Sequence, residues 1–549
     1  MWFSSWLRNR TGTGPCERGR ARKVMRKRAA ARLRLEALED RWLPSTLTVL
    51  NNLDHGAGSL RAEIAAANNG DEIVFAPSLG GATITLASQL TVSKSVDIEG
   101  PGASQLTVSG NNSSRVFDIQ GGATVKIAGL TVTAGFVQGS GTGGGGILNE
   151  PGATLNLSNI SFTNNEAHAD VGGAIWNEAG ATATVNACLF TNNQNVGFNG
   201  SAEGGAIDDD GTMSVASSTF TGNQAIGADG EVFGNGHGGA IGVDGTLSVT
   251  GCTFRDNQAL AGSVANGVTG LAQGLGGAID NFNVLTVSSS VFTDNQAVGG
   301  SGATSLPNPR ITAGVGGAIQ SLTGTVTISG CSFSGNQAIG GAGGAGGPGG
   351  VGFGGGLEVA RGCTLTLSDS TFDHNAAIGG AGGRGAVGGN AVGGGVGVDR
   401  GSTATITNNT VSHNQALGGA GGKGANGGNA WAGGLSVGGF STFGISDSSS
   451  VSLSGSTLSD NLAIGGDGGA GGNGGYGEGG GVFIRTGATL TVTATTITNN
   501  HANGGSGSGG GSDGQGVGGG VYNEGTCTFD VTTVINQNHA STSNDDVFP

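Results

Sequence analysis

The chain has 549 residues, of which 118 are glycine, and only 11% are charged and 5% aromatic. That much glycine is untypical of an ordinary globular domain, and the absence of a strict Gly-X-Y period excludes a collagen-like chain. The formal net charge of −15 at pH 7 argues against a nucleic-acid-binding protein, because phosphate contacts need a sustained basic surface.

Residues 1–45 are predicted to be a separate basic arm. Residues 1–41 contain twelve Lys or Arg and four acidic residues, a local balance of +8, which leaves −23 for the rest of the chain. Such an asymmetry indicates a disordered or export-related segment. No apolar run of about 7–15 residues follows the basic residues, so an ordinary signal peptide is not expected. The sequence also contains no candidate transmembrane span.

Residues 46–143 are predicted to form an N-terminal cap and irregular first coils. Ser59 is a helix N-cap, and the helix is expected over 60–69, with Gly70 closing it. Such a helix would cover the apolar open end of a stack of strands. Apolar residues at alternate positions then indicate short irregular strands as far as residue 127.

Residues 144–549 repeat two phrases. Gly-Gly-Ala-Ile, or a looser form of it, alternates with an apolar residue, usually Phe, that is followed three places later by Asn. Repetition of fixed motifs at this scale indicates a solenoid. We assign a structural role to these residues: Gly172, Gly173, Gly204, Gly205, Phe190, Asn193, Phe220, Asn223, Phe254, Asn257, Phe292, Asn295, Phe333 and Asn336.

One repeat predicts three short strands and three turns. In residues 204–224 the Gly-Gly phrase is followed by an Asp-Gly turn, an alternating strand at Thr212–Val215, and a strand that contains Phe220. This pattern predicts an all-β, single-stranded parallel β-helix, with coils about 4.8 Å apart. The phenylalanines should stack inside, the asparagines should form a ladder, and the glycines should permit tight corners. About fourteen coils in a monomeric rod are expected.

Glycine is concentrated between each ladder Asn and the next Gly-Gly phrase, as in residues 340–356, 379–395, 418–434 and 465–481. Variation in the length of these stretches explains the drifting period. We predict that they are loops which project from one corner, because loop length adds little free energy once the ends are fixed. Packing of these stretches as glycine-rich sheets is the alternative.

Three stretches resemble known families. The Gly-Gly-Ala-Ile and Phe-x-x-Asn repeats resemble those of chlamydial polymorphic outer membrane proteins. Residues 58–64 and 71–75 are similar to the cap of bacterial right-handed β-helix surface proteins, and residues 34–45 resemble an N-terminal motif of planctomycete exported proteins. The resemblances imply right-handed winding, export, and surface display or adhesion. Only eleven residues follow Asn538, so the outer-membrane barrel of the chlamydial proteins is not expected.

Acidic residues gather where the first strand of a coil meets its turn. Asp208, Asp210 and Asp244 are the candidates for acid/base catalysis, because adjacent carboxylates can raise one another's pKa. Glu178, Asp210 and Asp244, on consecutive coils, could instead bind Ca²⁺. Ordinary Asp-Gly turn chemistry is the third interpretation. No Lys or Arg lies between Glu178 and Asp244, which disfavours a lyase.

A second candidate site contains His374 and His413, which hold the same place on neighbouring coils, with Asp373 beside them. Two stacked imidazoles could bind a metal ion. Other repeats have Asn192, Asp256, Asp294 or Asp460 at this place, which indicates a solvated turn position instead.

From the sequence we predict a non-enzymatic, exported display or adhesion protein at the cell surface or outside the cell. Its partners would be extracellular glycans or surface proteins, and no cofactor is expected apart from a structural calcium ion. The alternative is a polysaccharide lyase or hydrolase of the pectate-lyase-like β-helix type. A structural envelope protein without a ligand is the third hypothesis.

Overall fold

The computed structural model divides the chain into Met1–Leu43 and Pro44–Pro549. It describes residues 44–549 except 199, 231–232, 265–270, 305–308 and 440–447. Nearly all of the predicted basic arm, including residues 34–43 of the export-type motif, therefore lies outside the described residues. In the part that is described, no helix is long and apolar enough to cross a membrane.

The described part begins with a cap made of β1 (Thr46–Val49), α1 (Leu60–Ala66), β2 (Glu72–Phe75) and the 3₁₀ helix η1 (Pro77–Leu79). The side chain of Ser59 accepts a hydrogen bond from the Ala62 N–H, as expected of an N-cap. The helix ends at Ala66, earlier than the sequence predicts. Lys94 of a later coil donates to the Ala65 and Ala67 carbonyl oxygens, and Asp71 accepts from the Asn68 N–H, so these bonds replace a further helical turn.

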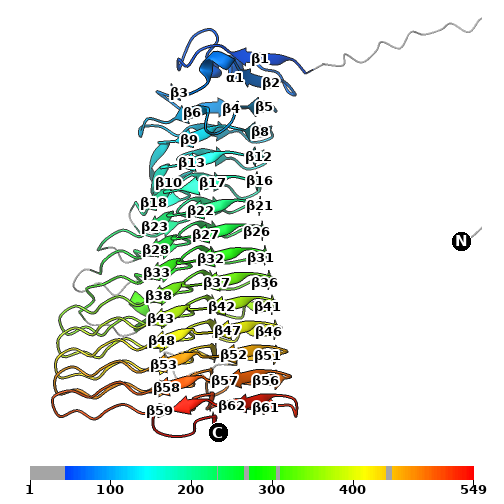
Figure 1. Ribbon diagram of the computed structural model, residues 1–549. Helices are drawn as coiled ribbons and strands as arrows, with labels where there is room; N and C mark the ends of the chain where they lie inside the picture. The colour runs from blue at the N-terminus through cyan, green and yellow to red at the C-terminus, as the bar shows by residue number, and fades with distance from the viewer. Residues whose placement is uncertain (1–43, 199, 231–232, 265–270, 305–308, 440–447) are drawn as a thin grey trace, which may run out of the picture. The chain divides into compact units, whose positions relative to one another are not determined.

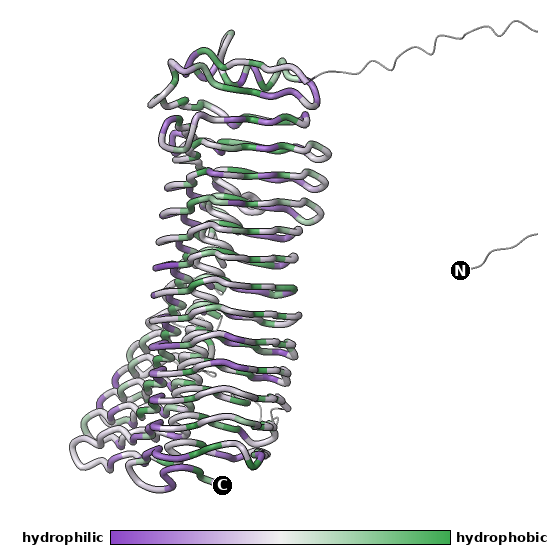
Figure 2. Tube along the Cα trace, turned by 45° about the vertical axis from the view of Figure 1, so that its right-hand side comes forward, coloured by the Kyte–Doolittle hydropathy of each residue, from purple (hydrophilic) through white to green (hydrophobic). Residues whose placement is uncertain are grey.

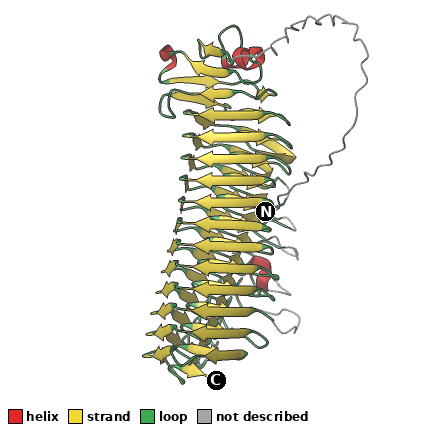
Figure 3. Cartoon of the chain, turned by 90° about the vertical axis from the view of Figure 1, so that its right-hand side faces the viewer, coloured by secondary structure: helices red, strands yellow, loops and turns green. Residues whose placement is uncertain are grey.

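Four parallel sheets run along the column of coils, with 15, 21, 14 and 14 strands (Figures 1 and 3). A typical coil consists of β20 (Ile207–Asp209), β21 (Thr212–Ala216), β22 (Thr219–Thr221), β23 (Gln224–Ile226) and β24 (Gly236–His237). We name the sheets after these strands: sheet A contains β21, sheet B contains β22, sheet C contains β20, and sheet D contains both β23 and β24. The predicted fold class, a right-handed parallel β-helix with a short capping helix, is confirmed.

Each coil of the repeat region has more strands than the three that the sequence predicts. The residues after the ladder Asn form one further strand in sheet D, and the two residues before the Gly-Gly phrase form another. Strands of two or three residues are too short to show an alternating pattern, so the sequence gives no sign of them.

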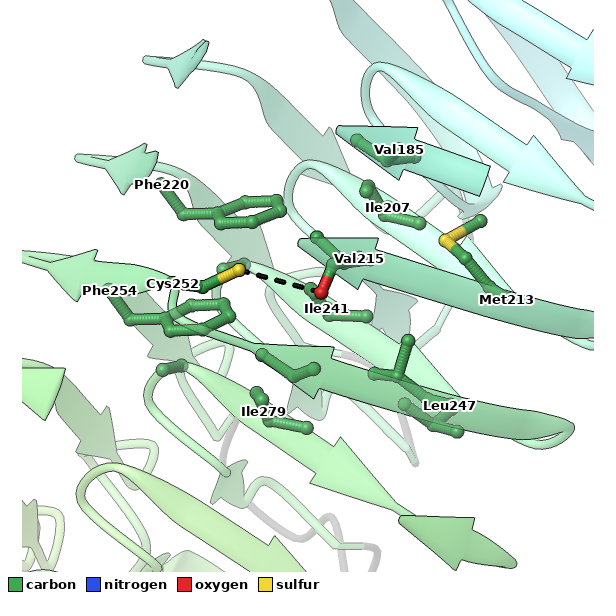
Figure 4. Close-up of a cluster of buried hydrophobic side chains, with 14 of the residues drawn as sticks. Val185, Ile207, Met213, Val215, Phe220, Ile241, Leu247, Cys252, Phe254 and Ile279 are labelled. Atoms are coloured by element: carbon green, nitrogen blue, oxygen red, sulfur yellow. Dashed lines mark hydrogen bonds between the residues drawn. The ribbon is translucent and has the colours of Figure 1, made fainter. Parts of the chain in front are cut away.

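The core lies inside the coils and is built from identical residues placed over one another. Phe220 pairs in register with Phe254, and Ile207 with Ile241 (Figure 4). From Phe162 to Phe372 successive rings stack with centroids 4.4–4.8 Å apart. Along the coils, hydrophobic positions alternate with hydrophilic ones (Figure 2). The predicted phenylalanine stack is present, and its members are fully buried.

The asparagine ladder is present too. Asn257 Nδ2 donates to the Asn295 side-chain oxygen at 2.9 Å and to the Phe220 carbonyl at 3.0 Å, and the Asn257 N–H donates to the same Asn295 oxygen at 3.1 Å. The same bonds recur from Asn165 to Asn500, which includes Asn193, Asn223 and Asn336. These amides are used inside the fold and are not available to a ligand.

The paired glycines form a tight corner between sheets D and C. Gly172 and Gly204 have φ values of +53° and +65°, which favour glycine. A Cβ at Gly173 would lie 2.1 Å from the Gly205 carbonyl oxygen, and one at Gly205 would lie 2.1 Å from that of Gly239. The corner therefore leaves little room for side chains, although Ala432 takes the first glycine position of its coil with a φ value of +57°.

The glycine-rich stretches project on one side of the coils, as predicted, and lie outside the four sheets over most of their length. They are also packed against one another in layers, as in the alternative interpretation. The Gly419 N–H donates to the Gly389 carbonyl at 2.8 Å, and the Gly466 N–H donates to that of Gly428 at 2.8 Å. A Cβ at Gly419 would lie 2.0 Å from the Gly380 carbonyl oxygen. We call the stacked layers of residues 340–352, 379–391, 418–430, 465–477 and 504–516 the flange, seen on the left of Figure 1.

Candidate functional site

The candidate acids lie along sheet C: Asp208 is in β20, and Glu178, Asp210 and Asp244 lie in the turns from sheet C to sheet A. In β20, Ile207 points into the core, so Asp208 points outward. The short strands that precede the Gly-Gly corner stand beside this outer surface and bury it. They are β19 (Ala202–Glu203), β24 (Gly236–His237) and β29 (Gly274–Leu275). As a result, Asp208 is only 2% exposed.

We call this place the acidic corner. Its members come from coils that are consecutive in the stack, since Asp208 pairs with Gly242 and Gly242 with Asp280, while Glu203 pairs with His237. The members of the acidic corner are Trp176, Glu178, Glu203, Asp208, Asp210, His237, Asp244 and Asp280. Asp209 points into the coil instead and accepts a hydrogen bond from the Asn177 side chain.

A buried ion pair lies at the centre of the corner. His237 Nδ1 is 2.7 Å from Asp280 Oδ2, and the two residues are 8% and 0% exposed. Burial lowers the pKa of His237, but the hydrogen bond to Asp280 and its negative charge outweigh this and raise the pKa overall. Among the described residues no donor reaches Asp280 Oδ1. The corner therefore keeps a charged pair that is incompletely satisfied, which is unfavourable for stability alone.

Glu203 and Asp208 are a second unusual pair. Burial raises the pKa of Glu203 to about 6; nearby His237 opposes this rise, and the Asp244 carboxylate adds to it. Burial also raises the pKa of Asp208 well above its usual range, with Glu203 contributing. A Cβ at Gly242 would lie 2.6 Å from Asp208 Oδ1, so this glycine leaves room for the Asp208 side chain. Carboxyl groups that hold their protons near neutral pH are suited to general acid catalysis.

The outer edge of the corner is open to solvent. Asp244 is exposed, and Glu178, Asp210 and Trp176 are half-buried. Trp176 Nε1 donates to Asp210 Oδ2 at 2.9 Å, which orients this carboxylate. Burial and the charges of Glu150 and Asp210 raise the pKa of Glu178. An aromatic ring beside carboxylates, next to buried carboxyl groups, is an arrangement that can hold and protonate a sugar.

The structure brings the predicted catalytic residues Asp208, Asp210 and Asp244 to one corner, since their charges act on one another. It does not gather Glu178, Asp210 and Asp244 into a compact ligand set. Among the described residues, one group of three or more metal-ligating side chains has its ligand atoms within 4.8 Å of one another, and that group is elsewhere. A calcium ion at Glu178, Asp210 and Asp244 would require these side chains to move.

The sequence analysis missed the roles of Glu203, His237 and Asp280, although a signal was present. In each coil the residue before Gly-Gly-Ala-Ile and the residue after it flank the same corner, as Glu203 and Asp208 do. Arg115 was missed as well, and its charge acts on Glu178. Its guanidinium is engaged by the Gly143 and Gly144 carbonyls and by Gln89.

No protein-family model matches this sequence, and no curated protein does. Solved structures that resemble it include the catalytic unit of a thermostable GH87 α-1,3-glucanase from Streptomyces thermodiastaticus. It is 13% identical, the match covers 91% of this chain and 70% of that one, and the TM-score is 0.41. A mannuronic acid-specific polysaccharide family 6 lyase from human gut microbiota is 8% identical over 82% of this chain and 86% of that one, with a TM-score of 0.36.

Tailspike protein 3 of bacteriophage CBA120 also resembles the chain. It is 11% identical over 89% of this chain and 57% of that one, with a TM-score of 0.33. At these identities and TM-scores the likenesses carry no information about what this chain binds or does.

Proposed function

We propose that the chain is a polysaccharide hydrolase that works at the acidic corner, outside the cell or at its surface. The observation that carries this proposal is the half-buried Glu203, whose pKa is raised to about 6 beside the exposed carboxylate of Asp244. Two carboxyl groups with different environments are the usual equipment for hydrolysis of a glycosidic bond.

In the proposed reaction, the Glu203 carboxyl donates its proton to the glycosidic oxygen as the bond to the leaving sugar breaks. The Asp244 carboxylate takes a proton from the water that attacks the anomeric carbon. Trp176 would stack against a sugar ring, and the His237–Asp280 pair would help to set the pKa of Glu203. Asp208, a candidate in the sequence, has no step of its own in this scheme.

We favour a hydrolase over a lyase because the described residues of the acidic corner include no Lys or Arg to neutralise a substrate carboxylate. A lyase must neutralise the substrate's carboxylate while a proton is removed next to it. The sequence from Gly144 to Phe254 contains no Lys or Arg, and the nearby Arg115 is bound to carbonyl oxygens.

The test is release of reducing ends from a panel of neutral and acidic polysaccharides, with detection of unsaturated products as a separate readout. We expect hydrolysis that falls at least about 100-fold in Glu203→Gln, which removes the proton donor. Glu478→Gln is the matched control, because Glu478 holds the equivalent strand position in a later coil, in β54 (Gly477–Glu478). Equal losses in both variants, or unsaturated products from the wild type, would overturn the hydrolase assignment.

A specific observation favours display or adhesion as the second candidate function. Over residues 325–493 the outward-facing residues of the sheet A strands are all threonine or serine, and part of this surface forms a shallow groove. The residues that line the groove are Thr364, Leu365, Thr366, Thr403, Ala404, Thr405, Ser450 and Ser452. Polysaccharide binding by the wild-type protein without any product would favour this function over hydrolysis. Neither binding nor cleavage would favour the envelope protein.

A further inference from the structure

A histidine pair far from the acidic corner has the geometry of a metal site. His374 follows β42 (Thr371–Asp373), and His413 follows β47 (Thr410–Ser412) on the next coil. The two imidazole rings stack with centroids 4.8 Å apart and planes 10° from parallel. The Asp373 carboxylate bridges the two rings: Oδ2 is 2.7 Å from His374 Nδ1, and Oδ1 is 3.0 Å from His413 Nδ1. All three residues offer ligand atoms within 4.8 Å of one another.

The turn itself accounts for only part of this arrangement. His374 and His413 have φ values of 56° and 54°, and Asn192, Asp256 and Asp294 have similar values at the same turn of other coils. Histidine, asparagine and aspartate tolerate this left-handed conformation better than most residues. The turn therefore explains why most coils have a polar residue here and two have glycine, Gly222 and Gly335. It does not explain histidine on two adjacent coils.

Asp373, whose carboxylate bridges the two imidazoles, departs from the residue that neighbouring coils have at its position. Asp373 pairs in register with Ser334 on one side and Ser412 on the other, and Ser412 pairs with Ser459. The Ser412 hydroxyl donates to Asp373 Oδ1 at 2.9 Å, which holds the carboxylate in place. Asp373 thus adds a third potential ligand at a position where the neighbouring coils have serine.

The chemistry of these donors selects the ion. Two imidazole nitrogens and one carboxylate oxygen suit Zn²⁺ and related divalent transition metals, whereas Ca²⁺ and Mg²⁺ prefer oxygen alone. The side chains of His374 and His413 are 62% and 51% exposed, so the imidazoles can turn toward a shared ion and leave a position open to solvent. We propose that Asp373, His374 and His413 bind one zinc-class divalent ion on the side of the β-helix.

The test is isothermal titration of the full chain with zinc chloride at neutral pH. We expect one equivalent to bind and to be removed by a chelator. The variant His374→Asn/His413→Asn keeps residues that the same turn carries in other coils, and Asp373→Ser keeps the residue of the neighbouring coils. Each variant should therefore fold and weaken zinc binding at least about ten-fold.

His501 and His539 provide the matched control, because they also meet on neighbouring coils, edge to face and with ring centroids 5.9 Å apart. The variant His501→Gln/His539→Gln should fold, since Gln415 holds the same register position in another coil. It should bind zinc as the wild type does, because it leaves Asp373, His374 and His413 unchanged. Cobalt(II) absorption in the visible range gives a second readout of imidazole ligation. The assignment is overturned if the wild type binds no zinc, or if zinc affinity is equal in the wild type and the His374/His413 variant.

Discussion

The corner between sheets C and D has the same backbone in its earlier and later coils. Its side chains are mainly charged in the earlier coils and mainly apolar in the later ones. Between sheets C and D, the coils around residues 203–280 enclose Glu203, Asp208, His237 and Asp280. The later coils enclose one buried acid, Glu358, and an apolar cluster that contains Val392, Trp431 and Phe483. The strands pair in register along the whole stack. Because apolar residues fill the later corner well, the backbone does not require charge in the earlier one.

This difference helps to separate structure from function in a repeat protein. Residues that recur on every floor, such as the ladder asparagines, use their polar groups inside the fold. Residues that break the pattern and remain incompletely bonded, such as Asp208 and Asp280, must be explained by something other than stacking. The acidic corner is one place where the chain accepts unfavourable burial of charge; Asp118 and Glu358 are buried on other coils.

The largest expected effect is in the apolar part of the corner. Phe483 is 2% exposed and lies between Trp431 and Tyr522, with ring centroids 5.9 and 5.5 Å away. Phe483→Ala should lower the free energy of unfolding by about 3–5 kcal/mol, because it leaves a cavity. Denaturant unfolding followed by circular dichroism measures this. A loss below about 1 kcal/mol would show that the apolar packing contributes little to the free energy of unfolding. The contrast between a charged stretch and a well-packed apolar stretch of the corner would then be wrong.

A second, smaller effect tests the buried ion pair. His237→Leu places at position 237 the residue that the next coil has at Leu275, but it leaves the Asp280 charge buried without its partner. We expect a loss of about 3 kcal/mol for this variant.

Addition of Asp280→Asn should recover most of that loss, because the double variant no longer buries an unpaired charge. The same denaturant experiment compares the single and double variants. If His237→Leu alone is neutral, the pair is not ionic in the folded protein.

The repeat could be predicted from the sequence because identical residues on every floor leave a periodic signal. Phe254 and Asn257, for example, are fixed by their neighbours above and below. The length of α1 could not be predicted, because Lys94, which ends the helix through its bonds to Ala65 and Ala67, comes from a later coil.

The acids were predicted only in part for a related reason. Asp208, Asp210 and Asp244 follow an obvious phrase, whereas Glu203 and His237 lie in strands of two residues that have no period of their own. Glu203 and His237 come close to Asp208 and Asp280 because the next residue, Gly204 or Gly238, has a left-handed conformation. This turn places the short sheet D strand beside the sheet C strand.

The smallest effect has the opposite sign and concerns Asp209. Burial raises the pKa of Asp209 to about 7, although hydrogen bonds from the Asn177 side chain and the Gly211 N–H oppose the rise. A carboxyl whose pKa is higher in the folded than in the unfolded protein stabilises the fold when it is protonated. This stabilisation is complete below the pKa in the unfolded state, near 4, and is lost as the pH rises toward 7. The protein should therefore be more stable at pH 5 than at pH 8.

Asp209→Asn should remove this part of the pH dependence and stabilise the protein by about 1–3 kcal/mol at pH 8, with little effect at pH 4. Asparagine suits the position, because Asn177 holds it on the preceding coil, and Asn149 shows that its amide can reach a strand of the next coil, at the Thr182 carbonyl. Denaturation midpoints at both pH values decide the matter. If Asp209→Asn lowers the stability at pH 8, the ionised Asp209 carboxylate stabilises the fold, because removal of an unfavourable buried charge should raise the stability.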